Sequence, residues 1–114
     1  MPKFLVLGAG KMGVVLAKDL ILSNDQNVVT LVDIDFERLK QARDFIPNDR
    51  LIPLQRNIED KSQREGIFKG QDVILAALLH EHSLLVLEEA VQQGVHLIDL
   101  VGDKPLERLV HDEK

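Results

Sequence analysis

The stretch Gly8-Ala9-Gly10-Lys11-Met12-Gly13 decides the fold of this chain. It directly follows an apolar run over residues 4–7, and it opens an amphipathic run over residues 14–22. A second apolar run, 28–32, ends at Asp33. This acid comes about 20 residues after the glycine-rich turn, which is the spacing typical of dinucleotide-binding proteins. A strand, a glycine-rich turn, a helix, a second strand and an acid in this order predict a dinucleotide-binding unit.

Each glycine of the motif has its own physical reason. We expect Gly8 to turn the chain sharply out of the first strand, Gly10 to let the backbone approach a pyrophosphate, and Gly13 to let the helix pack closely on the strand. The N-terminus of that helix offers N–H groups and a partial positive charge to phosphates. Asp33 is expected to accept hydrogen bonds from a ribose. The alternative, a glycine turn that binds nothing, fits the strand and helix context less well.

Composition narrows the class of protein. The chain has 114 residues, enough for one domain, and its net charge of −5 argues against nucleic acid or an anionic membrane as a partner. It has no cysteine, hence no disulfide and no thiolate metal site. No signal peptide is apparent, and no apolar run reaches the roughly 18 residues that a membrane span needs. We therefore expect a cytoplasmic protein with no membrane partner.

Apolar and amphipathic runs alternate along the whole chain. Strands are expected over residues 3–7, 28–32, 51–54, 72–77 and 95–100, and helices over residues 11–22, 36–46, 60–68, 81–93 and 106–112. This alternation predicts an α/β fold, a Rossmann-like doubly wound parallel sheet of five strands with helices on both faces. Pro53 suits an edge strand, because it has no N–H to donate. The nucleotide is expected at the switch point between the first and fourth strands.

Local signals also predict how the helices begin, end and face the sheet. Asp35 is a predicted N-cap, either Asp60 or Ser62 caps the helix over 60–68, and Gly94 is a predicted C-cap. Apolar side chains at helical spacing in the helix over 36–46 are Phe36, Leu39, Ala42, Phe45 and Ile46. Those expected to face inward from the helix over 81–93 are Leu84, Leu85, Leu87, Ala90 and Val91.

The second half of the chain indicates which family of dinucleotide-binding proteins the sequence resembles. Ala76-Ala77-Leu78-Leu79-His80 and the segment from Val86 to Leu100, together with the glycine motif, resemble the N-terminal cofactor domain of the saccharopine dehydrogenase family. The resemblance covers essentially the whole chain. It implies that residues 1–114 are an NAD(P)-binding Rossmann domain, the N-terminal fragment of a longer enzyme. A second domain would then bind the small-molecule substrate and often form a homodimer, and this chain alone would be inactive.

The resemblance also implies roles for individual residues. Gly8, Gly10 and Gly13 would bind the pyrophosphate, and Asp33 would bind the adenosine ribose. The same cofactor site would include Ala9 in the turn, Lys11 and Met12 over the cofactor, Ile34 beside the acid, and Ala76, Ala77 and Leu78 on the nicotinamide side.

The residues after the second strand bear on the choice of cofactor. Asp33-Ile34-Asp35 places two carboxylates near the adenosine ribose, where they would repel a 2′-phosphate. The first cationic residues that follow are Arg38 and Lys40. We therefore predict NAD as the cofactor, with NADP as the alternative.

Three residues are candidates for proton transfer. His80 and His82 follow the fourth strand, and Asp99 ends the fifth, so all three are expected near the edge where the cofactor binds. The alternative interpretations are capping histidines and a carboxylate that anchors a loop. A metal site is not predicted, because His80-Glu81-His82 lacks the four-residue histidine spacing of a helical zinc motif.

Three hypotheses of function follow, of which the third is a cofactor-binding or assembly module without catalysis. The first is the cofactor domain of an NAD(P)-dependent oxidoreductase that transfers hydride to or from a C–N bond of an amino-acid-derived substrate. The second is non-enzymatic, a nucleotide-sensing regulatory domain of a potassium channel or transporter, which would use the same glycine motif and acid. The segment 94–100 favours the dehydrogenase family.

Overall fold

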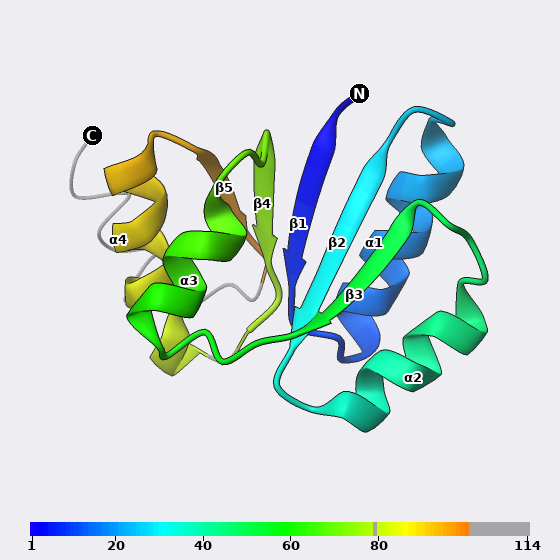
Figure 1. Cartoon of the computed structure of the whole chain (residues 1–114), viewed down its shortest axis with the longest axis horizontal. Coiled ribbons are helices and arrows are strands. Elements are labelled where there is room, and N and C mark those ends of the chain that lie inside the picture. Colours follow the sequence, from blue (N-terminus) through cyan, green and yellow to red (C-terminus); the bar gives the residue numbers. More distant parts are fainter. Residues whose placement is uncertain (79, 101–114) are drawn as a thin grey trace.

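The computed structural model describes residues 1–78 and 80–100 of the chain. Within this part, a single sheet of five parallel strands has the order β3-β2-β1-β4-β5 (Figure 1). The strands are β1 (Lys3–Leu7), β2 (Val28–Asp33), β3 (Leu51–Gln55), β4 (Val73–Ala76) and β5 (His96–Asp99). The predicted doubly wound sheet is confirmed, with its switch point between β1 and β4 and the proline-containing β3 at an edge.

Helices cover both faces of the sheet. In Figure 1, α1 (Lys11–Ser23) and α2 (Phe36–Phe45) lie on one side, and α3 (Lys61–Phe68) and α4 (Ser83–Gln93) lie on the other. A short 3-10 helix, His80–His82, leads into α4. Two apolar clusters result, one beneath each pair of helices.

The central strand explains why the first apolar run has no polar alternation. Val6 of β1 belongs to the cluster beneath α1 and α2, whereas Leu5 and Leu7 belong to the cluster beneath α3 and α4. All three side chains are buried. A strand covered on both faces is apolar at every position, and burying each such side chain stabilises the fold by about 1.5–3 kcal/mol.

The predicted helix caps are confirmed. The Asp35 carboxylate accepts hydrogen bonds from the N–H groups of Glu37 and Arg38 at the start of α2. Asp60 does the same for Ser62 and Gln63 at the start of α3. Gly94 ends α4 with a φ of 66°, a left-handed conformation that glycine adopts without steric cost. These caps fix where α2 and α3 begin, and both starting points lie beside the carboxyl edge of the sheet.

The expected inward face of α4 is wrong in part. Leu84 and Val91 are 57% and 71% exposed. The buried side chains of this helix are Ser83, Val86, Glu89 and Ala90. A carboxylate takes an inward position because Arg64 of α3 is buried against it. The buried face of α4 therefore includes a polar contact with α3, which the spacing of apolar residues in the sequence does not predict.

Two aromatic residues also depart from expectation. Phe36 and Phe45 are more than half exposed, and the helix buries Leu39 and Ala42 instead. Lys18 of α1 covers Phe45, with its Nζ 4.1 Å from the ring centre. No helix among the described residues is long and apolar enough to span a membrane. The helix expected over 106–112 lies outside the described residues.

The Asp60 cap predicts a change of stability in acid. Hydrogen bonds from the Ser62 hydroxyl and the Gln63 N–H lower the pKa of Asp60 from its usual value of 3.8. The carboxylate therefore stabilises the fold fully above about pH 4, and this stabilisation is lost as the pH falls through the lowered pKa. We expect the free energy of unfolding to fall less steeply below pH 4 in Asp60→Asn than in the parent chain. Chemical denaturation followed by circular dichroism measures this slope, with Glu88→Gln as the control variant. Equal slopes for Asp60→Asn and the parent would contradict the assignment.

Candidate functional site

The glycine turn is held between the ends of β2 and β4. The Gly8 N–H donates to the Val32 carbonyl oxygen at 2.7 Å, and Gly8 has a φ of 100°. A Cβ built at Gly8 would lie 2.5 Å from the Ala77 carbonyl oxygen. Both the backbone conformation and the close approach of Ala77 therefore require glycine at this position.

Gly13 and Gly10 have opposite surroundings. A Cβ at Gly13 would collide with the Gly8 carbonyl group, so glycine lets α1 start directly against the turn. Gly10 has a φ of −74° and a ψ of −173°, which any residue adopts, and no atom lies within 4 Å of a Cβ built there. Nothing within the described part of the fold itself demands a glycine at position 10. The open space on its surface is what close approach of a ligand to the backbone requires.

Asp33 joins the glycine turn to the start of α2. Its Oδ2 accepts a hydrogen bond from the Ala9 N–H at 2.7 Å, and its Oδ1 accepts one from the Asp35 N–H at 2.8 Å. The side chain is only 8% exposed. A carboxylate that is buried and held by two backbone donors has a fixed orientation.

Arg38 reduces the net negative charge at the end of β2, where the sequence places Asp33 and Asp35. The first turn of α2 returns its guanidinium to the carboxylates, with Nη1 3.8 Å from Asp33 Oδ2 and Nε 3.8 Å from Asp35 Oδ2. The Arg38 side chain is 58% exposed. Arg38 also lines a shallow groove with Ala9, Gly10 and Lys11, so two cationic side chains line the same groove as the glycine turn.

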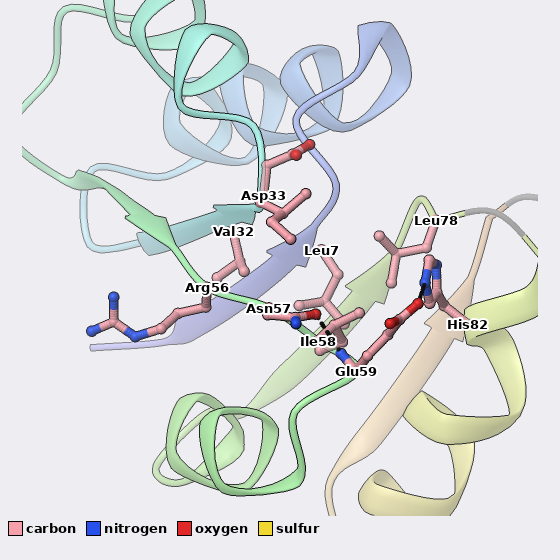
Figure 2. Close-up of a pocket in the computed structure, with 10 residues that line it drawn as sticks. Leu7, Val32, Asp33, Arg56, Asn57, Ile58, Glu59, Leu78 and His82 are labelled. Carbon is pink, nitrogen blue, oxygen red and sulfur yellow. Dashed lines mark hydrogen bonds and ion pairs between the residues drawn. The ribbon is translucent and has the colours of Figure 1, made fainter.

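A cavity of about 200 Å³ opens beside Asp33, at the carboxyl edge of the sheet (Figure 2). It is lined by the carboxyl ends of β1 and β2, by residues that follow β2, β3 and β4, and by the 3-10 helix. Those singled out from the sequence are Asp33, Ile34, Leu78 and His82. Those that sequence reasoning missed are Arg56, Asn57, Ile58 and Glu59. The cavity is completed by Leu7 and Val32, at the ends of β1 and β2.

The missed residues form the loop after β3. The Arg56 N–H donates to the Asp33 carbonyl oxygen at 3.2 Å, the Asn57 N–H to Gln63 Oε1 at 2.7 Å, and the Glu59 N–H to Asn57 Oδ1 at 3.0 Å. A signal for this loop was present in the sequence. Parallel strands end at the same edge, so a polar run directly after the third strand belongs to the same site as Asp33.

A polar contact crosses the cavity. His82 Nε2 lies 2.9 Å from Glu59 Oε1, which joins the loop after β3 to the 3-10 helix after β4, as Figure 2 shows. His82 is one of the residues that the sequence offers as a candidate for proton transfer. The structure places its side chain in the cavity that holds Asp33.

The other sequence candidates lie along the same edge. Asp99 ends β5 and is paired in register with Ala76 of β4. The Ala77 N–H donates to the Leu7 carbonyl oxygen at 2.8 Å, which fixes the backbone beside the glycine turn. Lys11 and Met12 are exposed in the first turn of α1, and His80 begins the 3-10 helix. Among residues 1–78 and 80–100, no group of three or more potential ligand side chains is placed to hold a metal ion. The catalytic roles of His80, His82 and Asp99 stay predictions.

Comparisons with known proteins agree with this geometry. The family model described as "Saccharopine dehydrogenase NADP binding domain" matches residues 4–111. Saccharopine dehydrogenase (L-Glu forming) from Saccharomyces cerevisiae superposes with a TM-score of 0.74 at 17% identity, covering 96% of this chain and 24% of that one. Prephenate dehydrogenase from A. aeolicus, solved with hydroxyphenyl propionate and NAD+, gives 0.65 at 20% identity, covering 87% and 33%.

A further similar structure is a short-chain dehydrogenase/reductase from Veillonella parvula in complex with NADP. It has a TM-score of 0.66 at 12% identity, with 86% of this chain and 46% of that chain covered. At these identities the likeness concerns the fold. The chain spans between about a quarter and a half of the length of these three structures.

Proposed function

The chain belongs to the family of saccharopine dehydrogenase NADP-binding domains, and from this premise we propose that it is the N-terminal dinucleotide-binding domain of a longer oxidoreductase. The substrate would be an amino-acid-derived compound that is oxidised or reduced at a C–N bond. The observation that carries the proposal is the open surface over Gly10, continuous with Asp33 through the turn that Asp33 itself holds.

Each part of the site would hold a different part of the dinucleotide. The pyrophosphate would lie over Gly10 at the N-terminus of α1, where backbone N–H groups and the helix dipole favour negative charge. The adenosine ribose would lie at Asp33, and the cavity lined by Ile58 would take the adenine. Leu78 also lines this cavity, so we propose it for the adenine end and not for the nicotinamide side, where the resemblance had it. When bound, the nicotinamide ring supplies the hydride chemistry. Ala76 and Ala77 would line its side of the site.

NAD is our proposed cofactor rather than NADP. Asp33 and Asp35 bring two carboxylates to the ribose end, and Arg38, which lies 3.8 Å from both, offsets one of these charges. A 2′-phosphate would therefore meet a net negative charge. Arg38 could pair with that phosphate only by giving up its contacts with both carboxylates. This repulsion acts on the phosphorylated cofactor alone, so it lowers the affinity for NADP(H) without changing that for NAD(H).

Calorimetric titration with NAD+, NADH, NADP+, NADPH and ADP tests the proposal. The chain has no Trp or Tyr, so intrinsic fluorescence is a poor probe. We expect NADH to bind about tenfold more tightly than NADPH, and a Gly10→Glu variant to bind neither, because its carboxylate would occupy the pyrophosphate position. Tighter binding of NADPH would overturn the choice of cofactor. Equal affinity for ADP and NADH would favour the nucleotide-sensing alternative, and no binding at all would overturn the dinucleotide site.

The proposal assigns catalysis to the longer protein. The matched saccharopine dehydrogenase is about four times as long as the aligned region, since only 24% of it is covered. The residues that bind the substrate would come from other parts of the enzyme. We expect this chain by itself to bind the dinucleotide and to show no dehydrogenase activity.

A further inference from the structure

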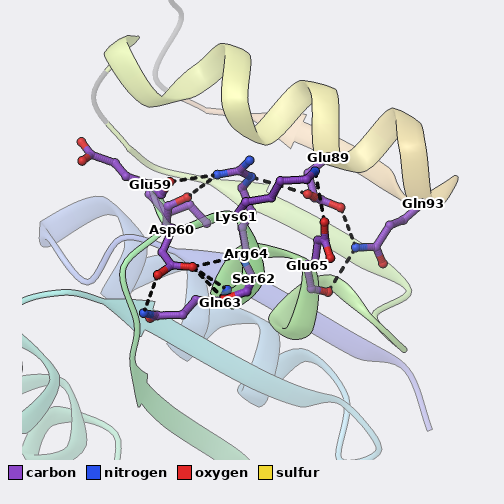
Figure 3. Close-up of polar contacts among 10 residues, drawn as sticks. Glu59, Asp60, Lys61, Ser62, Gln63, Arg64, Glu65, Glu89 and Gln93 are labelled. Atoms are coloured by element: carbon purple, nitrogen blue, oxygen red, sulfur yellow. Dashed lines mark hydrogen bonds and ion pairs between the residues drawn. The ribbon is translucent and has the colours of Figure 1, made fainter.

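A buried ion pair lies behind the cavity, away from the cofactor side. Arg64 of α3 and Glu89 of α4 have side chains that are 9% and 3% exposed, with Arg64 Nε 3.5 Å from Glu89 Oε1. Gln93 Nε2 donates to Glu89 Oε2 at 2.8 Å and to the Glu65 carbonyl oxygen at 3.1 Å. Figure 3 shows these contacts spanning the space between α3 and α4.

Arg64 also holds the loop after β3. Its Nη1 donates to the Ile58 carbonyl oxygen at 2.9 Å and lies 3.4 Å from the Glu59 carbonyl oxygen. Ile58 and Glu59 both line the cavity beside Asp33. One guanidinium therefore contacts the backbone of the cavity wall on one side and a carboxylate of α4 on the other.

Stability alone does not account for this pair. Removing two charges from water costs several kcal/mol for each ion, and apolar residues of similar volume are often as stable or more stable. The geometry is not that of a tight bidentate pair, since neither Arg64 Nε nor Glu89 Oε1 has a hydrogen-bond partner among the described residues. A rigid planar donor is, however, well suited to fixing two successive carbonyl groups of a loop.

We propose that Arg64 is a positioning residue for the nucleotide site, which sets the path of residues 57–59 from behind while Glu89 keeps its guanidinium in place. The proposal rests on the proposed function, because it takes the cavity to be where the adenine end of the ligand binds. Arg64 itself touches no ligand. It acts through the Ile58 and Glu59 backbone, and its loss would let the cavity wall move.

Three variants separate positioning from stability. Arg64→Met combined with Glu89→Leu removes both charges and keeps apolar volume. Arg64→Lys keeps the charge opposite Glu89 but loses the planar fork that contacts the loop. Glu89→Gln keeps Arg64 and its contacts to the loop. The measurements are the thermal midpoint, the affinity for ADP, and the amide chemical shifts of residues 57–59 without ligand.

We expect the double variant to unfold within a few degrees of the parent chain and to bind ADP about tenfold more weakly, a loss of about 1.4 kcal/mol, because the unheld cavity wall moves. Arg64→Lys should bind as weakly as the double variant, with shifted amides at 57–59. Glu89→Gln should retain most of the affinity.

If the affinity for ADP falls in proportion to the thermal midpoint across all variants, the effect is one of stability and the positioning role is overturned. Unchanged amide chemical shifts in Arg64→Lys would overturn it as well. If the double variant does not fold, Arg64→Lys and Glu89→Gln still make the comparison. Failure of the proposed function would look different, since the parent chain itself would then not bind ADP. The amide shifts of the ligand-free chains would still show whether Arg64 sets the loop.

Discussion

Gly13→Ala is expected to destabilise the fold and abolish NADH binding, whereas Gly10→Ala is expected to weaken binding and leave the fold intact. The Cβ of the first variant would collide with the Gly8 carbonyl group, against which α1 begins. Such overpacking costs about 1–3 kcal/mol, and the collision here is with backbone, which cannot rotate away. The Cβ of the second variant would enter open space that the proposed pyrophosphate occupies.

Thermal unfolding and calorimetry on the two variants make this comparison. Gly10→Ala should unfold at or slightly above the midpoint of the parent chain, because alanine fits the backbone angles at this position and restricts the unfolded chain. Its affinity for NADH should fall between about 5-fold and 160-fold, the effect of a steric cost of about 1–3 kcal/mol. An unchanged affinity in Gly10→Ala would show that no ligand approaches the backbone there. A normal midpoint in Gly13→Ala would contradict the packing argument.

Asp33→Ala is expected to lower both stability and affinity. The carboxylate is the acceptor for the N–H groups of Ala9 and Asp35, and Ala9 is buried. Removing it leaves the Ala9 N–H without that acceptor, which costs about 1–3 kcal/mol. The affinity for NADH should fall at least about tenfold, because the variant loses both the ribose acceptor and the contact that orders the glycine turn.

A matched control separates these two effects. Asp35→Ala removes the cap of α2, at a cost of about 1 kcal/mol, and leaves the contact between Asp33 and Ala9 in place. Its NADH affinity should stay within about threefold of the parent chain. Denaturation gives the free energies of unfolding, and calorimetry gives the affinities. If Asp33→Ala and Asp35→Ala lose equal affinity, Asp33 has no specific role at the ribose.

Asp33 shows that structure and function share one side chain. From the sequence it was a ribose acceptor, because an acid follows the second strand. In the structure the same carboxylate also connects the glycine turn to the start of α2, through one bond to each. A ligand that contacts Asp33 therefore meets a group whose direction the backbone has already set, which lowers the entropy cost of binding.

Much of the fold was predictable because its signals are local. The β1 strand is apolar at each inner position, Asp35 and Asp60 cap helices through N–H groups a few residues away, and Gly94 takes the left-handed conformation that ends α4. Alternation of strands and helices then leaves few topologies, because crossovers are right-handed. The order β3-β2-β1-β4-β5 followed from these rules.

The residues of the candidate site that were singled out from the sequence lie at the glycine turn, at the end of β2 and after β4. The loop at 56–59 was missed because it carries no motif and enters the site only through the parallel alignment of β3 with β2. Glu59 of this loop contacts His82, which lies 23 residues away in the sequence. Such contacts depend on how three strand ends meet, which no local pattern encodes.

Sequence by itself determined the sheet, its helices and the position of the glycine turn, because propensity, capping and apolar periodicity act over a few residues. Only the tertiary structure decided which face of α4 is buried and which charges meet. Glu89 is buried because Arg64 lies opposite it, and Arg38 returns to Asp33 because α2 begins at Asp35. Pairing between distant charges depends on the packing of whole elements, and its energy exists only once those elements are in place.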